Sequence, residues 1–461
     1  MLLINTLYWF QLNPLVDNCD GPKEPGYKLF VWLGYVLKEL RSRNMKVWLS
    51  GHVPPNEKNY EILCLRKYIV WSHEYRDVII GGLYGHMNID HFIPLDLKSA
   101  WKSLNKLLKP KKGKKKKGKK EKKSKSVIWK DQSVFEYVKL LAGDAVADQS
   151  IPENHLNFDN AEDLTLEELY KRNGVPEGGA PAEILGGVPK NKVDYLNTLR
   201  ENLYAGIKGK KKSGENSERY SIAHVGSLIV PTFNPGMRVW EYNITDLSSS
   251  YDARTVQYAS WDEFFEGVDK MMMYEESHES EVTNDIPKMV GDSKFTAFTT
   301  QSYYQTFMDI FKSKKKKKRD KTIPPIMPSD LPLGPAYTPQ LFTPERYVQY
   351  YADLASINNG EKKFGYEIEY TTDDNSYAMS LLTVDEWLKF GRKLGKPVKE
   401  KYREKHSRIK DNADVHGQSK KHVCEKKCDK ILSMELENLE MIWQNYLHNS
   451  FISSNYEDMN L

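Results

Sequence analysis

Two histidines, His52 and His86, stand in a sequence setting that is typical of metal ligands. Each directly follows a glycine, and each Gly-His pair comes one residue after an apolar run of strand length, at 45–49 and 78–83. A rigid strand fixes the direction of the imidazole that follows it, and the glycine permits a sharp turn. We therefore expect both rings to point at one divalent metal ion, each through a bond of ~2.0–2.1 Å.

Further polar side chains follow His86 within five residues. Asn88 is a candidate for an amide-oxygen ligand, and Asp90 and His91 are candidates for hydrogen bonds that orient the ligands. The alternative interpretation is a polar turn in which hydrogen bonds alone hold the histidines. Spacing leaves both interpretations open.

Residues 1–101 are expected to form an α/β unit that positions the histidines. Apolar residues recur at helical spacing over 28–44 and 57–75, and these segments alternate with the two strand-like runs. A strand, a helix and a strand in this order favour a parallel pair. Ligands of open α/β sheets bind at the carboxyl ends of the strands, where both histidines would lie.

The rest of the chain divides into three parts. Residues 102–218 are expected to form a lysine-rich, largely disordered insertion. Residues 219–260 are expected to supply strands, and residues 261–461 are expected to be mainly helical. The expected strands are 221–225, 227–230 and 237–242.

The positive charge of the 461-residue chain is local. Residues 109–125 hold twelve lysines and one glutamate and therefore carry a charge of +11. Since the net charge of the chain is +5, the rest of the chain carries about −6 (+5 − 11). Such a run is either a solvated segment or an attractor for a polyanion, meaning nucleic acid or polyphosphate. No aromatic residue interrupts it, which disfavours specific nucleic-acid recognition.

The four cysteines are too few to define a disulfide scaffold. Cys424 and Cys428 are one helical turn apart, downstream of His416 and His422. A zinc site, a disulfide across the turn and unlinked thiols remain open for this pair.

No apolar run reaches the ~18 residues that would span a bilayer. The first four residues are too short for a signal peptide and lack a basic start. Asn243-Ile244-Thr245 is a glycosylation acceptor pattern, relevant only if the chain enters the secretory route.

Three motifs together resemble the calcineurin-like metallophosphoesterases, in the branch near acid sphingomyelinase, and within it the fungal endopolyphosphatases. They are Gly51-His52-Val53-Pro54-Pro55, Gly85-His86-Met87-Asn88 and the run Val-Pro-Thr-Phe-Asn-Pro-Gly-Met-Arg-Val at 230–239. The similarity covers roughly 1–98 and 219–245. It implies an αββα sandwich, of which this chain would form the C-terminal half, with the long charged insertion and the helical region added.

The resemblance also implies two divalent metal ions and the hydrolysis of internal phosphoanhydride bonds in inorganic polyphosphate. By position, His52 and His86 would bind the second metal. Asn88 stands where many relatives have a third histidine, on the first metal. An amide oxygen is a harder ligand and favours Mn or Mg over Zn there, although Mn, Mg, Zn and Fe all remain candidates.

The chain departs from the family pattern before these motifs. The Asp-x-His, Gly-Asp-x-x-Asp and Gly-Asn-His-Asp/Glu segments do not occur in that order. They supply most of the first metal site, the bridging aspartate and the acid histidine, so no catalytic residue is assigned. The N-terminal membrane anchor of the fungal enzymes is absent too. We therefore expect a C-terminal part of a vacuolar enzyme that is inactive alone.

Two further hypotheses remain. A non-catalytic scaffold that binds polyanions would keep half of the fold without the chemistry. A phosphodiesterase for lipid head groups is suggested by the sphingomyelinase-like turns, but the chain has no saposin-like module. Metal-dependent cleavage of polyphosphate would separate the enzyme from the scaffold.

Overall fold

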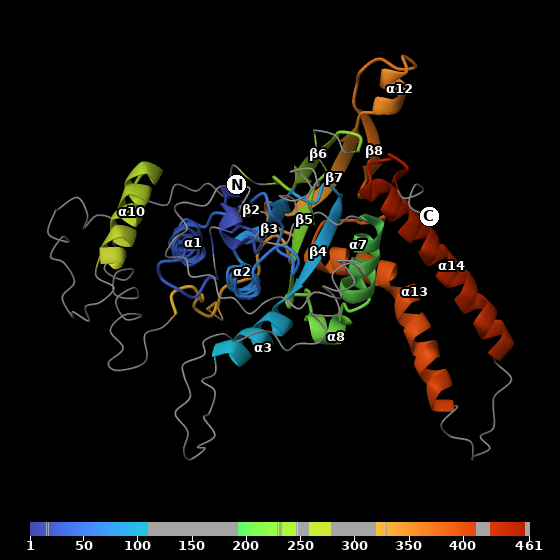
Figure 1. Ribbon diagram of the computed structural model, residues 1–461, viewed down its shortest axis with the longest axis horizontal. Helices are drawn as coiled ribbons and strands as arrows, with labels where there is room; N and C mark the ends of the chain where they lie inside the picture. Colours follow the sequence, from blue (N-terminus) through green and yellow to red (C-terminus); the bar gives the residue numbers. More distant parts are fainter. Residues whose placement is uncertain are drawn as a thin grey trace.

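The computed structural model describes residues 1–108 except 15 and 17, then 192–227, 229, 233–245, 247, 258–277, 320–328, 330–411 and 425–456. Two sheets form the centre of the molecule, and helices cover them (Figure 1). The lysine run 109–125 and Cys424 lie outside the described residues, as do two positions of the expected strand 227–230. Within the described part, none of the helices combines the length and apolarity that crossing a membrane requires.

The first sheet has five strands in the order β1-β2-β3-β5-β4. All neighbours are parallel except β4, which runs antiparallel to β5. Leu49 pairs with Gly82 and Ser50 with Leu83, so β2 and β3 end side by side. This confirms the predicted parallel pair. The strands are β1 (Leu2–Leu3), β2 (Val47–Ser50), β3 (Ile79–Tyr84), β4 (His91–Asp96) and β5 (Tyr220–Val225).

Helices α1 (Pro25–Ser42) and α2 (Ile62–Glu74) match the two helices expected from periodicity. Helix α1 begins earlier than expected because Pro25 fits the first helical turn, where no N–H is needed. Helix α2 begins later, where the Glu61 carboxylate accepts the N–H groups of Leu63 and Cys64 at 2.8 and 3.0 Å. The short 3₁₀ helix η1 (Thr6–Trp9) packs between them, with Trp9 stacked on Phe30 at 4.5 Å.

The second sheet is antiparallel and consists of β6 (Gly236–Tyr242), β7 (Pro344–Tyr351) and β8 (Glu367–Thr371). It faces the first sheet through aromatic rings: Trp240 lies 5.0 Å from Trp48 and 5.0 Å from His224. Strands β7 and β8 were not expected in the region from residue 261, which the sequence predicts to be mainly helical. Their aromatic and β-branched residues favour a sheet.

Four described helices belong to this C-terminal region: α10 (Trp261–Ser277), α12 (Leu354–Asn358), α13 (Val384–Asp411) and α14 (Glu425–Ser450). Helices α13 and α14 lie together, and α12 sits at the far tip of the second sheet (Figure 1). Trp387 of α13 packs on His224 of β5 at 4.8 Å. Because α13 reaches the first sheet, the C-terminal helices belong to the same core.

The described residues of the region 102–218 contain helices. They include the end of α3 (Leu97–Leu108), then α7 (Lys192–Leu199), the π-helix η4 (Arg200–Tyr204) and α8 (Lys210–Ser213). Tyr195, Leu196 and Tyr204 are buried in the core. The prediction of disorder rested on the high charge of the neighbouring sequence, and it therefore missed these buried apolar residues.

Candidate metal centre

The two Gly-His turns are joined by backbone hydrogen bonds at the carboxyl ends of β2 and β3. The Gly51 N–H donates to the Leu83 carbonyl at 3.2 Å, and the Gly85 N–H donates to the His52 carbonyl at 3.0 Å. These bonds continue the parallel ladder by one residue beyond each strand. They hold the backbones of both histidines side by side whatever side chains they carry.

The structure brings the two imidazoles together. The Nε2 atom of His52 and the Nδ1 atom of His86 are 3.3 Å apart, and the rings are nearly perpendicular at a centroid distance of 5.1 Å. Two nitrogens bound to one tetrahedral ion at ~2.0–2.1 Å are separated by about 3.4 Å. One hydrogen bond between neutral rings has a similar length, so both earlier interpretations fit this distance.

The environment of the two rings differs. His52 is exposed, whereas His86 is 7% exposed and packs edge-on against Phe10 at 5.2 Å. The Nε2 atom of His86 is buried and has no hydrogen-bond partner among the residues that the structure describes. Burial lowers the pKa of His86 to about 4, with further contributions from His52 and Lys58. A neutral imidazole needs no deprotonation before it binds a metal.

The glycines do not act as the sequence suggested. The left-handed backbone belongs to His86, with φ of 68°, and to Asn88, with φ of 59°, and neither Gly51 nor Gly85 has a positive φ. Gly51 is required for space, because a methyl group there would overlap Thr6 and lie 3.0 Å from the Ile4 carbonyl oxygen. At Gly85 the nearest atom would be His52 Nδ1, at an ordinary 3.8 Å.

We expect Gly51→Ala to lower the free energy of unfolding by about 1–3 kcal/mol, the usual effect of overpacking. The matched variant Gly85→Ala should stay within about 0.5 kcal/mol of the parent. Urea denaturation of both variants measures the difference. Equal destabilisation would contradict the steric role assigned to Gly51.

Asp90 and His91 do not orient the histidine pair, which corrects their assignment. The Asp90 carboxylate accepts hydrogen bonds from Arg238 and from the Tyr370 hydroxyl in the second sheet. His91 bonds through Nδ1 to the Ile89 carbonyl at 2.8 Å and through Nε2 to a tyrosine hydroxyl of α7 at 3.1 Å. The left-handed backbone at His86 and Asn88 precedes these two residues, whose side chains have partners other than the histidine pair.

Asn88 is half-buried in the same turn as His86. In the part of the chain that the structure describes, no group of three or more His, Cys, Asp and Glu side chains is arranged to hold a metal ion. The described residues therefore contribute two imidazole nitrogens to the candidate centre, with the Asn88 amide as a neighbour in sequence.

Lys58 is a charged group beside His86 that sequence reasoning missed. The loop that carries it packs on the His86 turn, because Asn59 Nδ2 donates to Met87 Sδ at 3.3 Å. Burial lowers the pKa of Lys58 to about 8, and the lysine charge in turn lowers the pKa of His86. The ammonium group has no hydrogen bond or ion pair among the described side chains. The only sequence signal was a lysine close behind the first Gly-His motif.

The sequence of the chain is similar to those of several known proteins. No protein-family model matches the chain. It is 49% identical to the endopolyphosphatase of Debaryomyces hansenii over all of this chain and 62% of that protein. It is 41% identical to the endopolyphosphatase of Saccharomyces cerevisiae over 87% of this chain and 57% of that protein. The chain is a homologue of the fungal endopolyphosphatases.

A third relative, the endopolyphosphatase of Kluyveromyces lactis, is 34% identical over 99% of this chain and 57% of its own length. This endopolyphosphatase homologue therefore spans about three-fifths of the length of these relatives. The alignment with the Debaryomyces hansenii protein covers the whole chain, so it includes both Gly-His turns and strand β6.

The homologue's glycosylation pattern lies at the end of β6. Asn243 is half-buried, and its backbone pairs with Thr343 and Phe342. Its side-chain oxygen accepts the N–H of Thr245 at 2.9 Å. The asparagine is thus held in an Asx turn at the edge of the second sheet.

Proposed function

We propose that this chain is the part of a metal-dependent endopolyphosphatase that supplies two histidine ligands, and that it belongs to a calcineurin-like metallophosphoesterase sandwich. The activity would be hydrolysis of internal phosphoanhydride bonds in inorganic polyphosphate. The observation that carries the proposal is the 3.3 Å separation of His52 Nε2 and His86 Nδ1. Similarity to proteins named endopolyphosphatases supports the choice of substrate.

The histidine pair fits a divalent ion. The nitrogens His52 Nε2 and His86 Nδ1 have the separation that chelation of one ion requires. Asn88 would add an amide oxygen. Divalent ions would polarise the phosphoryl group and stabilise its developing charge. The protein's own contribution is to hold neutral imidazoles in place and to present the Lys58 charge to the substrate.

Metal binding tests the proposal directly. We expect the purified chain to bind Mn²⁺ or Zn²⁺ and to lose that binding by about tenfold or more in His52→Ala and in His86→Ala, because each removes one ligand. His73→Asn, in the last turn of α2, is the matched control and should bind like the parent. Isothermal titration calorimetry measures all four. Equal affinities would remove the two histidines from the metal centre.

Lys58 should attract the polyanion. A unit charge at ~4 Å contributes about 1 kcal/mol even in bulk water, so we expect Lys58→Met to weaken tripolyphosphate binding by about fivefold at low salt. Added salt should reduce the difference. Lys102→Met, on the exposed surface of α3, serves as the control. A loss that is equal for both lysines would show a general effect of net charge.

The chain by itself is proposed to be inactive, because the described residues supply too few ligands for two metal ions. Gel electrophoresis of long-chain polyphosphate incubated with the purified chain and Mn²⁺ tests this. Metal-dependent shortening would refute it. Unchanged polyphosphate together with tight binding would favour the non-catalytic scaffold.

The setting of the enzyme is proposed by resemblance. It comprises a vacuolar location, a membrane anchor at the amino end of the fungal enzymes and glycosylation at Asn243. The lysine run 109–125 would collect polyphosphate electrostatically.

A further inference from the structure

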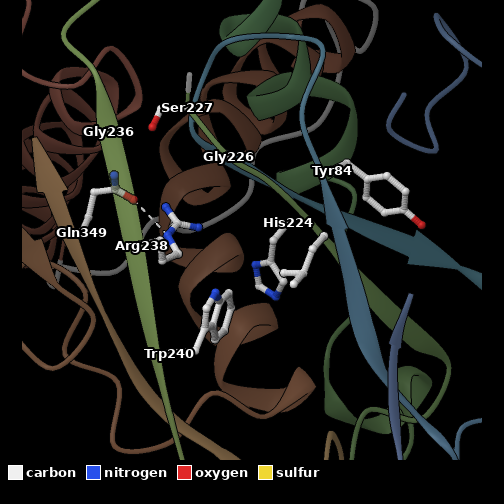
Figure 2. Close-up of a pocket in the computed structure, with 9 residues that line it drawn as sticks. Tyr84, His224, Gly226, Ser227, Gly236, Arg238, Trp240 and Gln349 are labelled. Atoms are coloured by element: carbon white, nitrogen blue, oxygen red, sulfur yellow. Dashed lines mark hydrogen bonds between the residues drawn. The ribbon is translucent and has the colours of Figure 1, made fainter. Parts of the chain in front are cut away.

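A cavity of about 180 Å³ lies between the two sheets, where β3 and β5 end and β6 begins (Figure 2). Gly226 and Ser227 follow β5, and Gly236 is the first residue of β6. A methyl group at Gly236 would overlap Ser227 Oγ and lie 2.8 Å from Gln349 Nε2. The space therefore depends on a residue without a side chain at this position.

His224 faces the cavity and has no hydrogen-bond partner among the described residues. Its side chain is 5% exposed and packs between Trp240 and Trp387 at centroid distances of 5.0 and 4.8 Å. Burial, with a smaller contribution from the charge of Arg238, holds the pKa of His224 well below its ordinary value. The neutral ring offers one N–H. Because the ring lines the cavity, this N–H is available to a ligand that accepts a hydrogen bond.

Arg238 brings a positive charge to the same space (Figure 2). Its Nε donates to Gln349 Oε1 at 2.9 Å, and its Nη2 donates to Asp90 and to the Tyr370 hydroxyl. These bonds leave Nη1 without an acceptor in the described part of the chain. The Ser227 hydroxyl also lines the cavity and makes no hydrogen bond there. Three donors of different kinds thus surround one space.

We infer that this cavity binds one phosphate-sized oxyanion through the Arg238 guanidinium, the Ser227 hydroxyl and the His224 N–H. All three groups can donate hydrogen bonds, and a phosphate oxygen only accepts them. The choice of phosphate over other oxyanions rests on the proposed function. The ligand is either free orthophosphate or one phosphate group of a longer chain.

Titrations in metal-free buffer test this site separately from the histidine pair. Orthophosphate, tripolyphosphate and sulfate are added to the parent chain, to Ser227→Ala and to His224→Phe, and binding is followed by calorimetry and ³¹P NMR. Ser99→Ala, on the exposed surface of α3, is the matched control. Ser227 is half-exposed, so its variant remains decisive if His224→Phe does not fold.

We expect orthophosphate to bind the parent and Ser99→Ala equally, and about tenfold more weakly to each cavity variant, the loss expected for one hydrogen bond to a charged group. If tripolyphosphate binds the parent as tightly as orthophosphate does, the site accepts one phosphate group of a longer chain. If orthophosphate binds and tripolyphosphate does not, the ligand is the free ion. No binding at ~10 mM, or equal binding in the cavity variants, would overturn the inference. Binding of sulfate but not phosphate would overturn it too. Failure of the proposed function would appear instead as absent metal binding.

Discussion

Arg238→Met is expected to lower the free energy of unfolding by about 3–5 kcal/mol, because it leaves the Asp90 carboxylate buried without its counter-ion. The side chains of Asp90 and Arg238 are 6% and 12% exposed. The Tyr370 hydroxyl also donates to Asp90, and the guanidinium lies 3.9 Å from the centre of the Tyr347 ring. The pair joins the segment after His86 to all three strands of the second sheet.

A second arginine of the same sheet provides the control. Arg346 pairs with Glu241 at 2.8 Å, but both side chains are at least 40% exposed. Arg346→Met should change stability far less than Arg238→Met, because exposed ion pairs contribute little. Guanidinium chloride denaturation of both variants gives the comparison. The double variant Asp90→Leu/Arg238→Met should be more stable than Arg238→Met, since it removes the unpaired charge. Similar losses at both arginines would contradict the role of burial.

Loss of the disulfide between Cys19 and Cys64 is expected to destabilise the protein by about 4 kcal/mol. The bond closes a loop with a sequence separation of 45, and the chain-entropy relation gives this value for a loop of that size. Both cysteines are fully buried, and Lys67 Nζ donates to the Cys19 carbonyl at 2.6 Å, which fixes the same loop on α2.

The double variant Cys19→Ala/Cys64→Ala tests this by thermal or chemical unfolding. The parent measured with a reductant should approach the stability of the variant, and the variant should not respond to the reductant. An unchanged midpoint for the parent after verified reduction would contradict the expected stabilisation. The sequence left the pairing of the cysteines open, because nothing in their spacing indicates that Cys19 folds back onto α2.

The local sequence pattern was sufficient to predict the fold of the α/β unit that carries His52 and His86. The alternation of apolar runs with helical periodicity predicted β2, α2 and β3, and the parallel arrangement follows from their order. Strands β7 and β8 were missed because β7 pairs with β6, which lies about a hundred residues earlier in the chain, and β8 adds to the sheet through β7. Such long-range pairing leaves little local signal.

At the candidate metal centre, too, features set by local sequence could be predicted and features set by long-range contacts could not. His52 and His86 could be brought together from sequence because each follows a strand of one parallel pair. Asp90 was assigned to the wrong neighbours because its direction depends on the left-handed turn at Asn88 and on Arg238, far along the chain. The Lys58 and His224 environments depend on burial between elements, which spacing does not reveal.

The backbone bridge between the two Gly-His turns has a consequence for engineering. Because main-chain atoms set the spacing of positions 52 and 86, a different side chain at either position inherits the same anchor points. In the proposed metal centre, cysteine at these positions would shift ion preference toward soft metals, and aspartate toward hard ones. Substitutions at these two positions should therefore change ion selectivity without a change in the backbone of the sheet.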